Sequence, residues 1–274
     1  MNRGAAPAAT GSGLWSKLFR AFLAGAVGVL VLFFLSLLVS LAGSTSLQRF
    51  LDLLVARDIR FAVRLSFITA TISTALAMCV AVPGAYALSR ASFPGKQMTD
   101  TLLDLPIVLS PVALGAALLL FFNNAVGAFI ERYFIEFVFS VPGLVLAQFT
   151  VVSALAMRLL KSTFDSIDTR YEKVGRVMGC SRMHAFSHVA LPLAKPGILA
   201  AGILCWARAV GEFGASVTLA GATAMKTETL PISIYLSLAS ADVERAVAAI
   251  FVLVFIALGS LLIVRRVTGA GYGP

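Results

Sequence analysis

Six long apolar segments, separated by shorter polar ones, constrain this chain more than any other feature of its sequence. The first, residues 21–42, contains no charged side chain; the others cover about residues 61–88, 101–122, 140–160, 196–220 and 246–264. A helix of roughly 20 apolar residues spans the hydrocarbon core of a bilayer. The sequence therefore predicts an all-α, polytopic membrane protein with six transmembrane helices.

Composition supports a protein that faces lipid. Hydrophobic residues make up 59% of the 274 residues, and the mean hydropathy is +0.94, which is more apolar than a soluble domain. Only 13% of the residues are charged, so the net charge of +9 gives no reason to expect a nucleic-acid partner. Cys79, Cys180 and Cys205 show neither metal nor disulfide spacing, and we expect them to be small packing residues.

The polar segments predict the domain organisation and the orientation. Residues 1–20 are expected to be a disordered cytoplasmic tail, residues 21–266 the transmembrane domain and residues 267–274 a C-terminal tail. A cleaved signal peptide is the competing interpretation of residues 21–42, although this apolar region is longer than a usual signal-peptide core. Lys and Arg are more frequent in the segments that lie inside if the N-terminus is inside, which favours two cytoplasmic termini.

The longest polar stretch between two apolar segments is Tyr171–Pro192, YEKVGRVMGCSRMHAFSHVALP. Its middle can form a helix, and Gly179 and the two residues after it are expected to bend the chain. Leu191-Pro192 is expected to end any preceding helix, because proline disfavours helix at the residue before it. A short basic helix of this kind either lies on anionic lipid or docks into a groove on a partner protein.

This stretch resembles the cytoplasmic coupling loop of bacterial and archaeal ABC importer permeases. The signature of that family is Glu-Ala-Ala, three residues, Gly, nine residues, Ile, one residue and Leu-Pro. All of its spacings match if Gly179 is the Gly, but Lys173, Val174 and Gly175 replace the triplet, and Glu172 lies one place upstream. The resemblance implies a coupling loop over residues 161–195 whose ATPase-coupling residues are Glu172, Lys173, Val174, Gly175, Gly179, Val189, Leu191 and Pro192.

Three other segments resemble the molybdate and tungstate branch of these permeases. Gly211–Ala215 reads GEFGA, where the sulfate branch more often has GEYG. Leu105–Gly115 resembles the third span of the branch, and Lys226–Leu238 resembles its outer loop. The resemblance covers about residues 61–266 and implies the type I ABC importer permease fold. A sulfate or thiosulfate permease, and less readily a self-sufficient channel or secondary transporter, are the alternatives.

The resemblance implies a transport subunit of the prokaryotic inner membrane that is not an enzyme. Its expected partners are two copies of an ABC ATPase, a second permease copy in a homodimer, an extracytoplasmic oxyanion-binding protein and membrane lipid. The chain has no Gly-x4-Gly-Lys-Ser/Thr loop, so we expect ATP and Mg on the partner ATPase and no cofactor on this chain. No catalytic residue is identified, and His184 and His188 lack the third ligand of a metal site.

Ionisable and hydroxyl side chains within the apolar segments are the candidates for a translocation path. Arg208 and Glu212 are four residues apart, and such costly groups usually face a cavity, the bundle interior or each other. They either line the path or form a structural ion pair. A dianion held too tightly would not leave, so hydroxyl groups suit its passage. The candidates are Ser66, Thr69, Ser73 and Ser110, and helix packing is the competing role for each.

Overall fold

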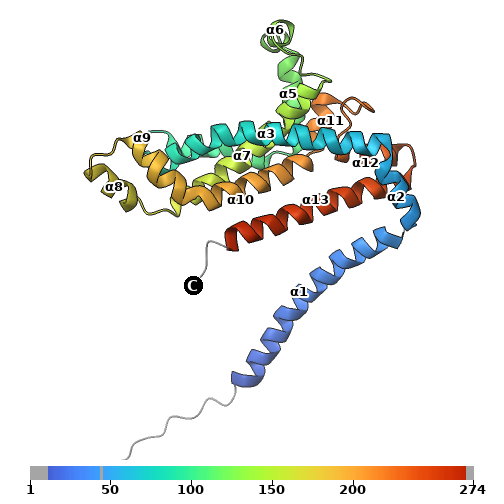
Figure 1. Ribbon diagram of the computed structural model, residues 1–274, viewed down its shortest axis with the longest axis horizontal. Helices are drawn as coiled ribbons and strands as arrows, with labels where there is room; N and C mark the ends of the chain where they lie inside the picture. Colours follow the sequence, from blue (N-terminus) through green and yellow to red (C-terminus); the bar gives the residue numbers. More distant parts are fainter. Residues whose placement is uncertain (1–11, 44–45, 270–274) are drawn as a thin grey trace, which may run out of the picture. The chain divides into compact units, whose positions relative to one another are not determined.

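The computed structural model describes residues 12–43 and 46–269, and every regular element in these ranges is a helix (Figure 1). The all-α prediction is therefore confirmed for the described residues. The chain divides into two compact units, residues 1–50 and 51–274, and each is described by itself.

The first unit contains α1 (Ser12–Gly43), a helix that is apolar on all sides. Its stretch Trp15–Leu41 has a mean hydropathy of 2.8 and is long enough to cross a membrane. The prediction of a disordered tail up to residue 20 is wrong for residues 12–20, because apolar side chains such as Trp15 and Phe19 extend the helical segment. Residues 1–11 of that predicted tail lie outside the described residues.

The polar segment expected before the second span is also helical. It forms α2 (Leu47–Val55) and the start of α3 (Arg57–Arg90). Phe50, Leu51 and Leu54 recur at helical spacing among the charges, a pattern that favours a helix in this segment. α3 continues past Pro83 and Gly84 without an interruption, and its 34 residues exceed what a bilayer requires.

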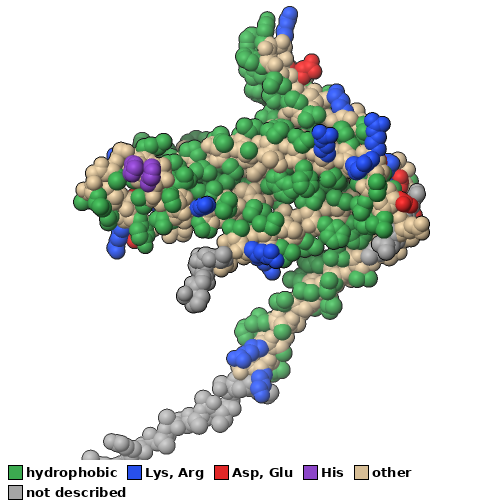
Figure 2. Space-filling model, in the orientation of Figure 1, with side chains coloured by type: hydrophobic (Ala, Val, Ile, Leu, Met, Phe, Trp, Pro, Cys, Tyr) green, Lys and Arg blue, Asp and Glu red, His purple; other side chains and the backbone are tan. Residues whose placement is uncertain are grey.

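The core of the second unit is built from four long helices that run alongside one another (Figure 1). They are α3, α7 (Val141–Asp165), α10 (Leu191–Val210) and α13 (Val243–Gly269), and α3 packs most extensively against α7. Many buried residues at these contacts are alanines, such as Ala77, Ala156 and Ala201. Small side chains let membrane helices approach closely. Figure 2 shows hydrophobic side chains over much of the visible face of α3 and α10.

The third predicted span is a broken pair, α4 (Lys96–Val108) and α5 (Pro111–Phe122), bent by 108°. The break falls at Leu109 and Ser110, which have extended backbone before Pro111. Pro111 begins α5 directly after this break, whereas Pro106 lies inside α4 and does not interrupt it. Within residues 12–43 and 46–269, five helices are long and apolar enough to cross a membrane, and the total reaches six if the bent pair is one span.

Short helices complete the second unit. The segment after α5 forms α6 (Ala125–Tyr133). The fifth apolar segment is not one helix, because α10 ends at Val210 and α11 (Gly214–Ala220) follows a break. The expected outer loop contains α12 (Leu230–Ala239), whose Leu230 and Ile232 are fully buried. The apolar half of this segment therefore packs into the protein.

Candidate functional site: the loop between α7 and α10

The predicted coupling loop folds into two short helices joined by a glycine turn. α8 (Arg170–Val177) ends in a Schellman motif, in which the Cys180 N–H donates to the Gly175 carbonyl over 3.1 Å and the Gly179 N–H to the Arg176 carbonyl over 3.0 Å. Gly179 has a φ of +94°, and a Cβ there would meet no atom within 4 Å. Glycine is therefore needed for the backbone conformation, which confirms the expected bend.

After the turn, the helix runs without a stop into the membrane segment. α9 (Arg182–Ala185) continues through the π-helix η1 (Phe186–Ala190) into α10. The prediction that Leu191-Pro192 ends the helix is wrong. The Leu191 N–H donates to the carbonyl of Phe186, five residues earlier, and this wider turn leaves room for the Pro192 ring, which would otherwise press on the preceding turn.

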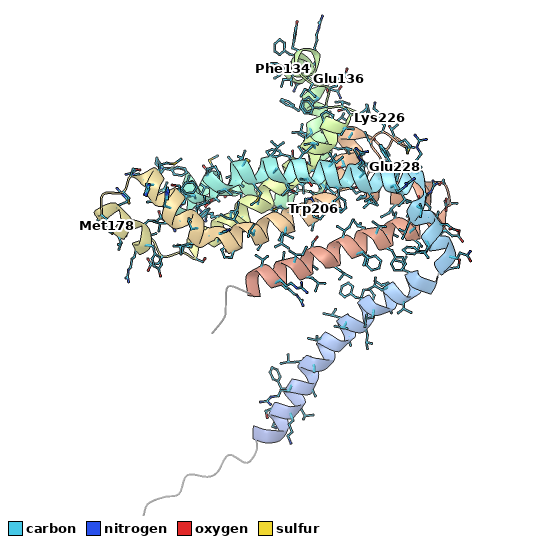
Figure 3. The ribbon with its side chains drawn as sticks, viewed as in Figure 1. Phe134, Glu136, Met178, Trp206, Lys226 and Glu228 are labelled. Atoms are coloured by element: carbon cyan, nitrogen blue, oxygen red, sulfur yellow. The ribbon has the colours of Figure 1, made fainter. Side chains whose placement is uncertain are left out.

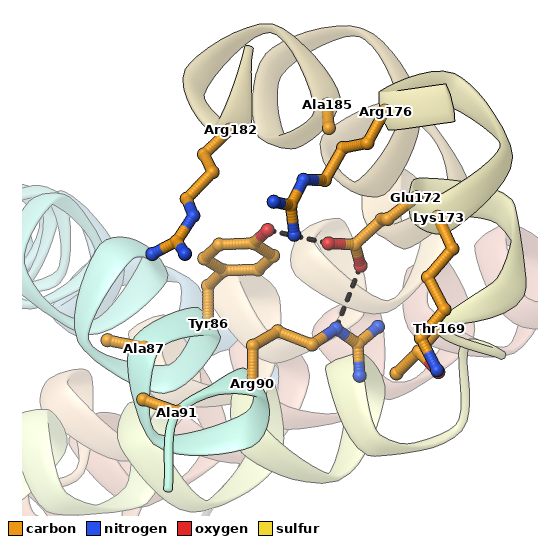
Figure 4. Close-up of a pocket in the computed structure, with 10 residues that line it drawn as sticks. All are labelled: Tyr86, Ala87, Arg90, Ala91, Thr169, Glu172, Lys173, Arg176, Arg182 and Ala185. Carbon is orange, nitrogen blue, oxygen red and sulfur yellow. Dashed lines mark hydrogen bonds and ion pairs between the residues drawn. The ribbon is translucent and has the colours of Figure 1, made fainter. Parts of the chain in front are cut away.

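Glu172 ties α8 to the end of α3. Its carboxylate accepts a hydrogen bond from the Tyr86 hydroxyl at 2.6 Å and pairs with Arg90 Nε at 2.8 Å (Figure 4). The other end of the Arg90 guanidinium donates to the main-chain carbonyl of Ile167 over 3.0 Å, beyond the end of α7. Glu172 is only 8% exposed, and its charge is balanced and hydrogen-bonded. Three segments therefore meet at the Arg90–Glu172 pair.

The remaining predicted coupling residues occupy both sides of the loop. Val189 packs on Gly175, since a Cβ atom added at Gly175 would lie 3.8 Å from the Cγ2 atom of Val189. Leu191 is half-buried, whereas Lys173, Val174 and Pro192 are exposed. The structure thus brings the two ends of the signature together across α8 and η1.

The outer edge of the loop is apolar and exposed. Val177 is 89% exposed and Met178 is 80% exposed, and Met178 lies at the tip of the loop (Figure 3). Both line a shallow groove of about 360 Å³ together with Val174, Arg170 and Lys173. An exposed apolar patch with a polar rim marks a surface for a partner.

The inner side of the loop holds a cavity of about 560 Å³ between α3, α8 and α9. Glu172 and Tyr86 line it, together with the four basic side chains Arg90, Lys173, Arg176 and Arg182 (Figure 4). Arg90 pairs with Glu172, whereas the other three form no ion pair with any part of the chain that the structure describes.

Arg208 and Glu212, predicted as an intramembrane pair, do pair with each other. Arg208 Nη1 lies 2.6 Å from Glu212 Oε2, and Glu212 is 1% exposed. Its Oε1 atom also accepts the Ala215 N–H over 3.0 Å, so Glu212 caps the first turn of α11. The pair therefore bridges the break between α10 and α11.

The predicted path hydroxyls fall into two groups. Ser66, Thr69 and Ser73 are fully buried: Ser66 accepts the Leu230 N–H over 2.8 Å, Thr69 donates to the Leu65 carbonyl over 2.9 Å and Ser73 donates to the Thr69 carbonyl over 2.7 Å. Ser110 is exposed and caps α5 by accepting the Ala113 N–H over 3.2 Å. The first three lie in helix-packing positions, and a role in lining a path stays a prediction for all four.

Comparison with known proteins identifies the family. The family model described as "Binding-protein-dependent transport system inner membrane component" matches residues 81–268, more than half of the chain. The chain belongs to this family. It is a multi-pass permease subunit of ABC importers and not an enzyme, since ATP hydrolysis belongs to a separate ATPase. The family works with an ATPase and a substrate-binding protein.

Three relatives of the permease have names that specify a substrate. A "Probable molybdenum ABC transporter permease protein" of Haloferax volcanii is 40% identical over 73% of this chain and 72% of its own. A "Molybdate/tungstate transport system permease protein" of Thermococcus kodakarensis is 33% identical over 76% and 78%. A "Sulfate transport system permease protein" of Synechococcus elongatus is 33% identical over 70% and 68%.

A solved structure supports the fold. A chain of a bacterial alginate ABC transporter, in complex with a periplasmic protein bound to an alginate pentasaccharide, matches with a TM-score of 0.71. The match covers 93% of the permease and 95% of that chain at 17% identity, so it shows the fold alone. The predicted type I importer fold is confirmed.

Sequence reasoning missed two residues of the loop site. Tyr86 and Arg90 hold Glu172, but they lie in α3, far from the signature in sequence. Their own spacing carried a signal, because residues four apart share one face of a helix. A tyrosine and an arginine on one face at the end of a span are suited to bind a carboxylate, but the sequence did not indicate which carboxylate.

Proposed function

We propose that this permease carries molybdate, tungstate or both across the cytoplasmic membrane. The observation that carries the proposal is the 40% identity to a relative whose name specifies molybdenum. The molybdate/tungstate relative and the GEFGA segment, Gly211–Ala215, support the same substrate class. Sulfate is the second candidate, because a sulfate relative is 33% identical.

We further infer that the loop between α7 and α10 couples transport to ATP hydrolysis. The exposed edge at Val177 and Met178 offers apolar surface to a groove on the ATPase. The ATPase chain, and not the permease, would bind ATP and Mg. Glu172 connects α8 with α3, so movement of the docked loop passes directly to a long membrane helix. The signature residues Lys173, Val174, Gly175, Gly179, Val189, Leu191 and Pro192 shape this surface or the helices behind it.

The assembly we propose contains two permease copies, two ATPase copies and one extracytoplasmic binding protein, surrounded by lipid. Both termini lie in the cytoplasm, which puts the coupling loop on the ATPase side. The excess of Lys and Arg in the inner segments supports this orientation.

We propose different roles for the predicted path residues according to their exposure. Ser110 and the partly exposed Arg208 face the route of the anion. Ser66, Thr69, Ser73 and Glu212 are buried and hold the helices that form this route. Weak contacts at the exposed positions suit an anion that must leave as well as enter.

The test of the substrate is ATP-dependent uptake of radiolabelled molybdate into proteoliposomes that contain the permease, its ATPase and its binding protein. We expect uptake that tungstate blocks and sulfate does not. Uptake of sulfate alone would favour the second candidate. Uptake that does not depend on ATP would contradict the importer mechanism itself.

The test of the coupling loop uses two substitutions of Gly179. Gly179→Trp puts a large ring where the structure has open space, so we expect it to block docking and abolish uptake while the protein still inserts. Gly179→Ala is the matched control, because it adds only the backbone strain of a positive φ, about 1 kcal/mol in the free energy of unfolding. Equal uptake by the two variants would contradict the docking role.

A further inference from the structure

The exposed charges of the coupling loop are mostly positive. Over residues 161–195 the acidic residues are Asp165, Asp168 and Glu172, whereas the basic ones are Lys161, Arg170, Lys173, Arg176, Arg182 and Lys195. Glu172 is buried, Asp165 lies 3.4 Å from Lys161 and Asp168 lies 3.8 Å from Arg170. The loop therefore presents unbalanced positive charge to whatever it docks against.

This charge gathers around the cavity between α3, α8 and α9. Lys173 and Arg176 are three residues apart on one face of α8, and Arg182 reaches the same cavity from α9 across the Gly179 turn (Figure 4). The one lining carboxylate, Glu172, is already engaged at both oxygens, by Tyr86 and by Arg90. Three like charges around one hollow repel one another, and an external anionic group would relieve that repulsion.

The shallow groove at the outer edge of α8 is also bordered by basic side chains. Arg170 and Lys173 border the exposed side chains of Val174, Val177 and Met178. An apolar centre with a charged rim is the usual anatomy of a protein interface, in which rim charges select the partner and speed association. Lys173 lines both hollows, so one surface joins them.

We propose that this surface fits an acidic groove on the partner ATPase, with Lys173, Arg176 and Arg182 paired to Asp or Glu side chains of that chain. This inference rests on the proposed coupling function and specifies the partner's chemistry. Lys173 stands where the family signature has glutamate, so the sign of the charge is inverted at that point. An ATPase whose groove is basic, and so suits an acidic loop, would place positive charges against these positive side chains. Such an ATPase would bind this permease poorly.

The experiment measures the dissociation constant between the ATPase and the whole permease in nanodiscs of zwitterionic lipid. The reversal variant is Lys173→Glu with Arg176→Glu. The matched control is Arg132→Glu with Lys226→Glu, which makes the same change in net charge at exposed positions away from the loop; Lys226 and Met178 lie far apart in Figure 3. We expect the reversal to raise the dissociation constant about tenfold or more and the control to leave it within about twofold.

Two further binding measurements test the same charge pairing, one at high salt and one with a charge-reversed ATPase. At about 1 M salt the Debye length falls to about 3 Å, so binding of the unmodified permease should weaken toward that of the reversal variant. An ATPase with lysines in place of its acidic groove residues should bind the reversal variant better than the original permease. Both results would support the acidic groove.

Three outcomes distinguish a failure of the proposed coupling function from a failure of the acidic-groove proposal. If the unmodified permease does not bind the ATPase, the proposed coupling function fails. If it binds and the reversal changes nothing, the acidic groove is overturned while coupling stands. If the reversal lowers only the retention of phosphatidylglycerol in mixed-lipid nanodiscs, the cations face lipid, and the proposal is likewise overturned.

Discussion

Glu172 and Glu212 are both buried glutamates paired with an arginine, but they connect very different parts of the chain. Glu172 meets Arg90 of α3, 82 residues away, at 2.8 Å. Glu212 meets Arg208, four residues earlier, at 2.6 Å and caps the helix that follows. A pair four residues apart depends mainly on the local course of the chain, whereas a pair between distant segments exists only in the folded protein. Glu172 therefore holds separate elements together, and Glu212 shapes one break.

The largest effect should come from Glu172→Ala. This substitution leaves Arg90, whose side chain is 14% exposed, without its carboxylate, and breaking a buried pair in this way costs about 3–5 kcal/mol of the free energy of unfolding. α8 also loses its tie to α3, so we expect ATP-dependent uptake to fall about tenfold or more per inserted molecule.

Asp168→Ala is the matched control for this experiment. Asp168 is an exposed acid in the same loop; it lies 3.8 Å from Arg170 Nε and its Oδ1 accepts the Arg170 N–H over 2.8 Å. Its removal loses an exposed pair and one hydrogen bond at the start of α8, about 1 kcal/mol, but leaves Glu172 tied to α3, so uptake should stay nearly unchanged. Normal uptake by a well-inserted Glu172→Ala variant would show that the tie between α3 and α8 is not needed for coupling.

A middle-sized effect is expected from Glu212→Ala. It removes the cap of α11, which contributes about 1 kcal/mol, and a pair with the partly exposed Arg208, which contributes up to about 1 kcal/mol. The midpoint of thermal unfolding in detergent should fall by a few degrees. Glu212→Gln keeps an acceptor for the Ala215 N–H and should lose less. If the two variants lose equal stability, Glu212 does not act as a cap.

The smallest effect should come from Tyr86→Phe. It removes one hydrogen bond to Glu172, while Arg90 still pairs with the carboxylate, so the free energy of unfolding should fall by only about 1 kcal/mol. Uptake should stay within about threefold of the unmodified permease, because α8 is still held. A loss as large as that of Glu172→Ala would mean that the hydroxyl, and not the arginine, holds the loop.

The two glutamates also show what sequence reasoning can reach in a site of this kind. The Arg208–Glu212 pair could be predicted because its members are one helical turn apart. Glu172 was singled out only because it lies next to the family signature. Its partners on α3 could not be predicted, since their position depends on how α3 is rotated against α7 and α8.

The same division holds for the fold. Long apolar segments predicted the spans. The expected outer loop contains a buried helix, α12, which was not predicted because polar residues precede it in the same segment. The end of α10 at Val210 was missed because apolar residues continue on both sides of the break.

The sequence by itself determined the features that depend on neighbouring residues. These are the apolar helices, the glycine that ends α8 and the pair of charges one turn apart. Only the tertiary structure decided which side chains meet between helices: Glu172 with Tyr86 and Arg90, and Ser66 with the Leu230 N–H. Local features follow from the period of the helix, whereas contacts between helices depend on packing and rotation, which no short stretch of sequence specifies.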